Sequence, residues 1–410
     1  MKEGKEKKPM SLATKIFIAL VAGIVVGLVF QSQADFLTSY IQPFGTIFLN
    51  LLKFIVVPIV LFSIMAGVVS MSDIRKVGKV GGITVVYFFI TTAIAIVIGL
   101  VLAHAFKGSF PALTTTGLEY EAKEPIPFMD TLVNIFPSNF LSPMVDATML
   151  QVIVIALILG FAIILIGGEK SAKAISAIDV LNEVFMKAME MIISLSPFGV
   201  FCLLAPVVAV NGPMVIGSLA KVILAAYIAY IIHAVCVYSL SVKFLSGMSP
   251  IKFFKGISAS MAFAFSSASS VGTLPLTLEN CDELGAEHEI SSFVLPLGAT
   301  INMDGTAIYQ GVAAVFIASC YGIDLTGSQM MTIVLTAVLA SIGTAGVPGS
   351  GMIMLAMVLQ SVGLPVEGIA LIAGVDRIFD MGRTCLNITG DASCAIIVSH
   401  LDRKWKGEEA

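Results

Sequence analysis

The sequence predicts an all-α membrane protein with eight transmembrane helices and two re-entrant helical hairpins. The first observation behind this prediction is composition. Of the 410 residues, 57% are hydrophobic and only 12% are charged, and the mean hydropathy is +0.99. Soluble domains are about 45–50% apolar and roughly 25% charged. The other two observations are a series of long apolar segments and an alternation of basic and non-basic loops between them.

Eight apolar segments are long enough to cross a hydrocarbon core about 30 Å thick, which takes about 20 helical residues. They cover residues 13–31, 41–70, 81–106, 128–167, 175–210, 213–242, 287–321 and 365–399. No small-residue cleavage site follows the basic N-terminus, so the first segment is predicted to be a spanning helix and not a removed signal peptide. Several segments exceed the required length by far, so tilts or breaks are expected.

The charged loops predict the topology. Basic residues cluster at the N-terminus, at 75–79, 169–173 and 243–255, and in the C-terminal tail. The intervening loops are acidic or nearly uncharged. Because Lys and Arg are enriched in cytoplasmic loops, eight spans make the two kinds of loop alternate. This alternation predicts a multi-pass protein of the cell membrane with both termini in the cytoplasm.

Two further apolar stretches, about 256–280 and 329–362, are interrupted by small residues and a proline. The interruptions read "SSASSVGTLPLT" (266–277) and "SIGTAGVPGSG" (341–351). Backbone that leaves the helix in hydrocarbon survives only where protein, water or a ligand satisfies it. Both stretches are therefore predicted to be hairpins that enter from opposite sides. Kinked spanning helices are the alternative, but they would break the alternation of loops.

Each interrupted stretch is followed by a helix with a polar centre. "NMDGT" (302–306) follows the first, and "DMGRT" (380–384) follows the second. The order of hairpin and polar-centred helix thus occurs twice, with opposite entry sides, which makes a weak inverted repeat. Inverted repeats whose broken helices meet at the midplane are typical of secondary transporters.

The last apolar segment carries a stripe of polar residues. At about 100° per residue, six of them fall on one stripe about 100° wide, and Arg377 lies just beyond its edge. The six are Asp376, Asp380, Arg383, Thr384, Asn387 and Asp391. Structural ion pairs are the alternative to a functional cavity. However, the carboxylates of this segment outnumber its guanidiniums, and Asp304 adds another. The excess negative charge indicates a site that cations neutralise.

Other chemistries have little support. The six cysteines have no paired spacing, and the four histidines (His104, His233, His288 and His400) form no metal motif. No histidine lies in either interrupted stretch, which argues against an intramembrane hydrolase, and no ring of pore charges indicates an ion channel. The sequence predicts a transporter and not an enzyme, with no cofactor and no nucleic-acid partner.

The motifs "SSVGTLP", "NMDGTAIYQG", "SIGTAGVPG" and "DMGRTxxNxTGD", in this order, resemble the glutamate transporter family of dicarboxylate/amino acid:cation symporters. The resemblance covers nearly the whole chain and is strongest from 260 to 400. It implies a homotrimer in the lipid bilayer, in which a mobile transport domain moves like an elevator against a scaffold. The implied scaffold parts are 1–78 and 109–212, the transport parts are 79–108 and 213–400, and 401–410 is a cytoplasmic tail.

The resemblance also implies a substrate site. Arg383 looks like the residue that binds the side-chain carboxylate, and its planar fork suits that group. Asp380 would receive the α-ammonium group. The other implied contacts come from polar side chains of the two polar-centred helices and from the hairpin tips. They are Ser269, Ser270, Thr306, Gly346, Val347, Gly351, Thr384 and Asn387.

Three Na⁺ sites are implied in the same way, with Na⁺ as the coupling ion. The first joins Asp391 and Asn302 to the carbonyls of Asn387 and Gly298. The second uses carbonyl groups near the helix breaks, at Thr300, Met303, Ser341, Ile342 and Thr344. The third uses Asp304, Asn302, Thr91 and Thr92. On this reading Asp304 is tolerated at membrane depth because it is a cation ligand.

The chain departs from the family pattern at four positions. Ala268 stands where prokaryotic aspartate carriers often have an arginine in the first hairpin, and Arg377 stands where they have a small residue. Phe88 replaces a tyrosine near the third Na⁺ site. Gln310 stands where animal relatives have a proton-carrying glutamate. Arg377 is therefore a tentative site residue, proposed to supply the missing positive charge. On the helix it lies about 20° from Thr384, so its side chain is expected to reach toward the serines of the first hairpin and to pair with Asp380 or Asp376 when the site is empty.

The leading interpretation is a sodium-coupled symporter of L-aspartate or L-glutamate. A proton-coupled or mixed-coupling carrier of the same substrates and a C4-dicarboxylate carrier of the same fold remain as alternatives. Asp380 weighs against the dicarboxylate carrier, since a substrate without an ammonium group leaves that carboxylate unpaired. A neutral amino acid carrier would not need Arg383.

Overall fold

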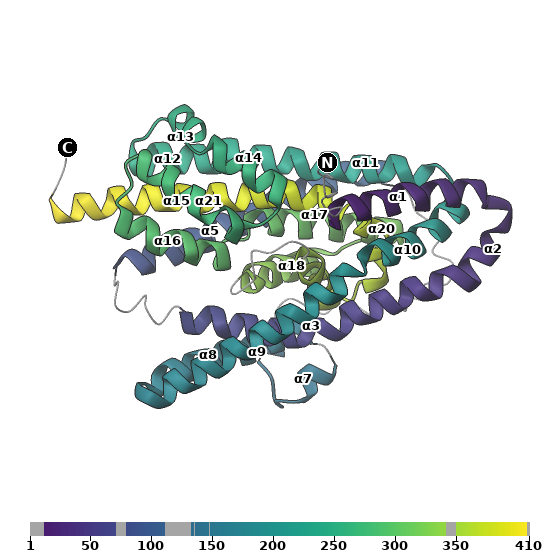
Figure 1. The fold of residues 1–410 in the computed structure, drawn as a ribbon, viewed down its shortest axis with the longest axis horizontal. Helices are drawn as coiled ribbons and strands as arrows, with labels where there is room; N and C mark the ends of the chain where they lie inside the picture. The colour runs from purple at the N-terminus through teal and green to yellow at the C-terminus, as the bar shows by residue number, and fades with distance from the viewer. Residues whose placement is uncertain are drawn as a thin grey trace, which may run out of the picture.

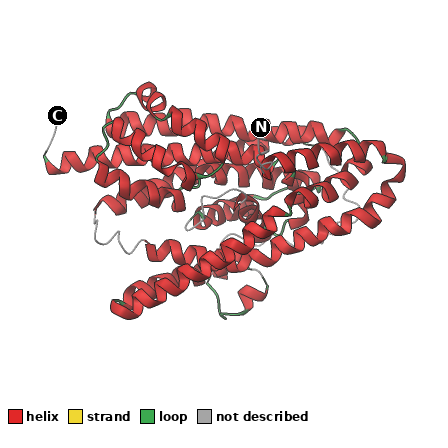
Figure 2. Cartoon of the chain, viewed as in Figure 1, coloured by secondary structure: helices red, strands yellow, loops and turns green. Residues whose placement is uncertain are grey.

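The computed structural model describes residues 12–70, 79–110, 133–134, 136–146, 148–341 and 350–407. Within these ranges every regular element is a helix and no strand occurs (Figure 2). This confirms the predicted all-α class. The long apolar segments leave no period-2 alternation from which a half-buried strand could form.

The elements of the first half are α1 (Leu12–Val29), η1 (Gln31–Gln33), α2 (Ala34–Phe36), η2 (Leu37–Ile41), α3 (Gln42–Ser70), α5 (Lys79–Phe106), η4 (Lys107–Ser109), α7 (Ser142–Val145), α8 (Met149–Ile166), α9 (Gly168–Ser194) and α10 (Ser196–Asn211). Those of the second half are α11 (Met214–Ile232), η5 (His233–Tyr238), α12 (Ser239–Ser246), α13 (Pro250–Gly256), α14 (Ser258–Ser267), α15 (Ser270–Glu283), α16 (His288–Ile301), α17 (Asp304–Cys320), α18 (Gly327–Ala340), α19 (Ser350–Ser361), η6 (Val366–Gly368), α20 (Ile369–Ala373) and α21 (Asp376–Lys406).

The helices pack in two groups (Figure 1). In the first group α1 lies against α10, and α3 packs on α8, α9 and α10. In the second group α21 is surrounded by α12, α14, α15, α16 and α17, while α5 packs on α17 and α11. The two groups meet where α20 contacts α10 and where α19 contacts α3 and α8. All 17 residues of α17 are buried, so this helix lies at the centre of the second group.

The first interrupted stretch forms a helical hairpin, α14 and α15, as predicted. The two short helices pack against each other and turn at Ala268 and Ser269. Ala268 has a φ of 53°, the one positive φ of a non-glycine residue in the described part of the chain. The Ser269 hydroxyl accepts a hydrogen bond from the Gly272 backbone N–H at 3.0 Å and caps α15. Pro275 lies in the second turn of α15, where it removes one backbone hydrogen bond of the helix.

The second interrupted stretch forms α18 and α19, which also pack together. Residues 342–349 between them lie outside the described residues. A capping box at Thr326 and Gln329 begins α18, and Ser341 ends it.

Several predicted spans are broken in the structure. The segment 287–321, predicted as one polar-centred helix, is two helices, α16 and α17, separated at Asn302 and Met303. Asn302 has an extended backbone, with φ −88° and ψ 103°. The segment 175–210 is bent by 48° between α9 and α10. Pro197, at the start of α10, contributes to this bend because proline cannot donate a backbone hydrogen bond within a helix.

Three continuous helices of the described ranges are long and apolar enough to cross a membrane, and the bent pair α9–α10 would make a fourth. The three cover Gln31–Val69, Lys79–Ser109 and Gly217–Ser246. The helices of the other predicted spans are shorter or divided by breaks, and α21 is not among the three. The number of eight spans therefore stays a prediction.

Candidate functional site

The predicted polar stripe of α21 lies inside the second packing group. Its six residues are all buried, and they face the broken end of α16, the first turn of α17 and the hairpin α14–α15. Residues 376 and 391 are about four turns apart on α21 and lie on the same side of the helix. The periodic spacing therefore predicted correctly which residues are buried together.

The Arg383 guanidinium lies between two carboxylates and an aromatic ring. Its Nε donates to Asp380 Oδ1 at 2.9 Å, and one terminal nitrogen lies 2.8 Å from the same oxygen. The other terminal nitrogen is 3.4 Å from Asp376 Oδ1. The guanidinium carbon is 4.9 Å from the centre of the Tyr309 ring. At 2% exposure the charge is desolvated, and these three partners compensate it.

Two glycines make room for Arg383. A Cβ on Gly351, in the first turn of α19, would overlap the guanidinium. A Cβ on Gly305, in the first turn of α17, would overlap the Arg383 backbone. Both helices therefore approach α21 at backbone distance. The guanidinium lies against the first turn of α19.

Asn387 links α21 to the start of α17. Its side-chain oxygen accepts a hydrogen bond from the Gly305 backbone N–H at 2.7 Å. Its amide nitrogen lies 3.4 Å from both the Thr306 hydroxyl and the Met303 sulfur. Because the helix breaks at 302–303, the first backbone N–H groups of α17 have no helical partners. The Asn387 side chain accepts a hydrogen bond from one of them, the N–H of Gly305.

Asn302 connects this polar centre to Asp391. Its amide nitrogen donates to Asp391 Oδ1 and to the Asn387 carbonyl, each at 2.9 Å. Its side-chain oxygen is buried and has no hydrogen-bond partner among the described residues. A Cβ on Gly298 would overlap the Asp391 carboxylate. The carbonyl oxygen of Gly298 accepts from the Asn302 backbone N–H at 2.8 Å.

Asp304 is fully buried and accepts hydrogen bonds from three side chains. The Thr92 hydroxyl donates to Oδ1 at 2.6 Å. The Tyr238 hydroxyl donates to Oδ2 at 2.7 Å, and His233 Nε2 lies 3.1 Å from the same oxygen. His233 and Tyr238 were missed by the sequence analysis. Their only signal was a histidine inside a long apolar segment, with no spacing that linked it to Asp304.

Asn302 thus contacts the Asp391 carboxylate directly, and Asp304 follows it two residues later at the start of α17. Carboxylate, amide and backbone oxygens are hard ligands of the kind that Na⁺ and other hard cations accept. The unpartnered oxygen of Asn302 is the observation that fits a cation here, since a buried amide oxygen is rarely left without a partner.

The remaining predicted Na⁺ ligands differ in how they are placed. The hydroxyls of Thr91, Thr300 and Ser341 each donate to a carbonyl of their own helix, at 3.2, 2.9 and 2.7 Å. Thr300 lies in the last turn of α16, where backbone carbonyls lack helical partners, whereas the Met303 carbonyl at the break accepts a hydrogen bond from the Ala307 N–H at 2.8 Å. Ile342, Thr344, Gly346 and Val347 lie outside the described residues.

Of the predicted substrate contacts, Ser270 and Thr384 are buried, and the Ser269 hydroxyl is used in the cap of α15. Arg377 reaches the first hairpin. Its guanidinium donates to the carbonyl oxygens of Ser266 and Ser267 at 3.2 and 3.1 Å. It also lies 3.8 Å from Asp380 Oδ2.

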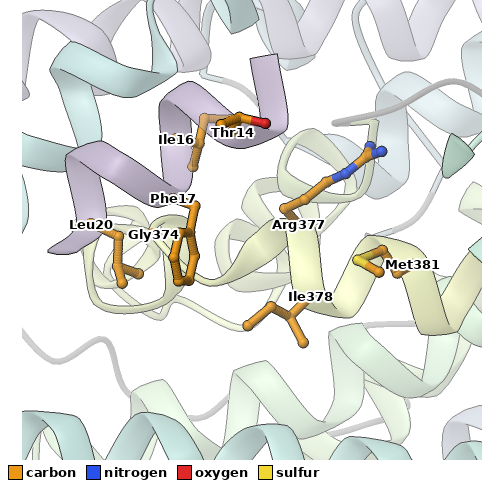
Figure 3. A pocket seen from close by; sticks show the side chains of 8 residues that line it. All are labelled: Thr14, Ile16, Phe17, Leu20, Gly374, Arg377, Ile378 and Met381. Carbon is orange, nitrogen blue, oxygen red and sulfur yellow. The ribbon is translucent and has the colours of Figure 1, made fainter. Parts of the chain in front are cut away.

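A crevice of about 300 Å³ lies between α1 and the start of α21. It is lined mainly by apolar side chains, and the Arg377 side chain extends along one side (Figure 3). The lining residues are Thr14, Ile16, Phe17, Leu20, Gly374, Arg377, Ile378 and Met381. The crevice separates the two packing groups near the polar site.

Comparison with known proteins gives a consistent result. A family model described as the sodium:dicarboxylate symporter family matches residues 12–401. The chain is similar to a proton/sodium-glutamate symport protein of Geobacillus stearothermophilus, with 37% identity over 98% of this chain and 96% of the relative. It is 34% identical to a proton/glutamate-aspartate symporter of Escherichia coli, over 98% of this chain and 95% of the relative. It is also 31% identical to a C4-dicarboxylate transport protein of Bacillus subtilis, over 96% and 94%.

Proposed function

Because the chain belongs to the sodium:dicarboxylate symporter family, we propose that it couples the uptake of L-aspartate or L-glutamate to the entry of Na⁺. The resemblance seen in the motifs is thereby confirmed, as is the prediction that the protein is a transporter and not an enzyme. It is an integral membrane protein of apolar helices.

The observation that carries the choice of substrate is the pairing of Arg383 with Asp380, at 2.8–2.9 Å. A substrate carboxylate that binds the guanidinium replaces this partner and frees Asp380. The α-ammonium group of an amino acid then pairs with the freed carboxylate. A C4-dicarboxylate has no such group, so the buried Asp380 would lose the contact with Arg383 without gaining an ammonium group and would keep the Arg377 guanidinium at 3.8 Å, which favours an amino acid as substrate.

Coupling to Na⁺ is supported by the contacts of Asn387, which connect the residues near Arg383 to Asn302 and Asp391. Its side chain contacts Thr306 and the Gly305 N–H beside the substrate position, while its carbonyl accepts from Asn302. A cation bound to Asn302 and Asp391 therefore orders the same helix turn that faces the substrate. Binding of either ligand then favours binding of the other, as thermodynamic linkage requires.

Two alternatives follow from the relatives. Proton-coupled transport of the same substrates is favoured by the names of two relatives, which include protons. C4-dicarboxylate transport is favoured by a third, at 31% identity.

One experiment separates these functions. The full chain is reconstituted in proteoliposomes, and uptake of tritiated aspartate is measured under separately imposed Na⁺ and H⁺ gradients. Unlabelled glutamate, succinate and serine serve as competitors. We expect accumulation with the Na⁺ gradient alone and competition by glutamate but not by succinate. Accumulation with the H⁺ gradient alone, or strong competition by succinate, would replace the proposal with the corresponding alternative.

The homotrimer, the elevator movement and the division into scaffold (1–78 and 109–212) and transport parts (79–108 and 213–400) belong to the same proposal. The two packing groups are consistent with this division, since α5 packs with the second group although it lies between helices of the first. A cysteine pair across the crevice, at Phe17 and Met381, tests the movement. We expect cross-linking to block uptake and reduction to restore it, whereas unaffected uptake would contradict an elevator.

A further inference from the structure

A π-helical turn brings His233 and Tyr238 to the same carboxylate. The two residues begin and end η5, the π-helix between α11 and α12. In an α-helix, five residues turn about 500°, which would leave the two side chains about 140° apart. In a π-helix the bonding runs from residue i to i+5, so residues five apart lie nearly above each other. Both side chains consequently face Asp304. The centres of their rings are 4.8 Å apart, and the rings pack edge to face.

The three donors to Asp304 are divided between its two oxygens. Tyr238 and His233 both contact Oδ2, at 2.7 and 3.1 Å, while Oδ1 accepts from Thr92 alone among the described side chains. Oδ2 is therefore held from the side of η5. Oδ1 is held by one hydroxyl, and this hydroxyl can rotate to offer a lone pair instead of a proton.

Helix α21 leaves space for this arrangement. A Cβ on Gly390 would lie only 2.5 Å from both the Tyr238 hydroxyl and the Asn302 amide nitrogen. Gly390 thus lets the η5 side chains and Asn302 approach the same spot from two sides. The imidazole of His233 is fully buried, and its Nδ1 has no hydrogen-bond partner among the described residues. With the carboxylate as acceptor, the ring hydrogen belongs on Nε2.

We propose that His233 and Tyr238 are positioning residues that hold Oδ2 of Asp304, so that Oδ1, together with Thr92 and Asn302, is the edge that meets Na⁺. This inference rests on the proposed function, because it takes Asp304 to be a Na⁺ ligand. Partners that orient a cation ligand from behind commonly change cation affinity by about 10- to 100-fold when removed. A buried carboxylate held on one oxygen also needs no reorientation when the cation arrives.

The test measures Na⁺ and substrate separately on the purified full chain. Calorimetry gives the Na⁺ concentration for half-maximal aspartate binding, and the aspartate Kd at saturating Na⁺. Thermal unfolding in Na⁺-free buffer reports folding. The variants are Tyr238→Phe, His233→Leu and His233→Gln, of which the last keeps an N–H near the position of Nε2. Tyr87→Phe is the matched control, since the Tyr87 hydroxyl contacts Ser241 and Ser393 but not Asp304.

We expect Tyr238→Phe and His233→Leu each to raise the half-maximal Na⁺ concentration by at least about tenfold. The aspartate Kd at saturating Na⁺ should stay within about twofold, as should the Na⁺ dependence of Tyr87→Phe. His233→Gln should recover most of the Na⁺ affinity. In an Asp304→Asn background, Tyr238→Phe should add no more than about twofold, because both changes act on the same ligand.

The outcomes distinguish the two levels of the proposal. If Asp304→Asn shifts the Na⁺ dependence but Tyr238→Phe and His233→Leu do not, the positioning role is wrong and the proposed function stands. If Asp304→Asn itself leaves the Na⁺ dependence unchanged, the Na⁺ site at Asp304 fails. If His233→Gln is as weak as His233→Leu, or if the variants lose Na⁺-free thermal stability in proportion to Na⁺ affinity, the residues serve packing alone.

Discussion

Replacement of Arg383 by cysteine is the perturbation with the largest expected effect on substrate choice. The guanidinium makes a two-point contact with Asp380 at 2.8–2.9 Å and a weaker contact with Asp376 at 3.4 Å. A substrate carboxylate in the same fork would receive two charge-assisted hydrogen bonds. At about 1.5–3 kcal/mol each, their loss is worth about 3–6 kcal/mol. This corresponds to a decrease in aspartate affinity of about 10²- to 10⁴-fold.

The change has a second consequence for specificity. Without the guanidinium, Asp380 still offers its carboxylate to an α-ammonium group, and the shorter side chain leaves space under Gly351. We therefore expect Arg383→Cys to bind serine, alanine or cysteine in place of aspartate. Asp376 loses its partner too, so unfolding is expected to be easier by up to about 3–5 kcal/mol.

The assay is competition of a panel of amino acids against Na⁺-dependent binding, with thermal unfolding to confirm that each variant is folded. Arg403→Cys is the matched control, because Arg403 lies at the far end of α21 and is 3.9 Å from Glu287. Arg383→Lys keeps the charge but loses the fork, and it should bind aspartate more weakly than the wild type and better than Arg383→Cys. Retention of micromolar aspartate binding by Arg383→Cys would refute the assignment.

The remaining predictions concern the Na⁺ ligands, the glycine contact and the second arginine. Asp304→Asn and Asp391→Asn should each lower Na⁺ affinity by at least about tenfold, or 1.4 kcal/mol; unchanged Na⁺ titrations in both would remove them as ligands. Gly305→Ala should abolish uptake or destabilise the protein by about 1–3 kcal/mol, since its Cβ overlaps the backbone of α21; normal uptake and melting temperature would contradict that packing. Arg377→Ala should impair aspartate binding, and Arg377→Ala with Ala268→Arg should partly restore it. A double-mutant cycle with a coupling energy within error of zero would show that Arg377 does not replace a hairpin arginine.

The position of Arg377 shows how far helical spacing carries a prediction. From its angle on α21, this residue was predicted to reach the serines of the first hairpin, and its guanidinium does contact the carbonyls of Ser266 and Ser267. Its predicted pairing with Asp380 in the empty site corresponds to a distance of 3.8 Å. Its role in binding stays a prediction that the double-mutant cycle tests.

The sequence by itself determined the all-α class, the membrane environment and the polar stripe of α21. These properties depend on composition and on the period of 3.6 residues, which any helix of this chain must follow. The break at the first hairpin was also predictable from the serine-rich run 266–270, because serine side chains favour helix ends, where they bond to free backbone N–H groups.

Only the tertiary structure decided which side chains surround Asp304. Thr92 and Tyr238 are more than 60 residues away from it in the chain, and no short-range period relates helices that far apart. The π-helical turn of η5 even contradicts the α-helical angle that the sequence would assign to His233 and Tyr238. The division of the segment 287–321 at Asn302 was likewise decided by tertiary contacts. Asp391 accepts from the Asn302 side chain and Asn387 accepts from the Gly305 N–H, both at the break. The local sequence could not predict these partners, because they are supplied by another helix.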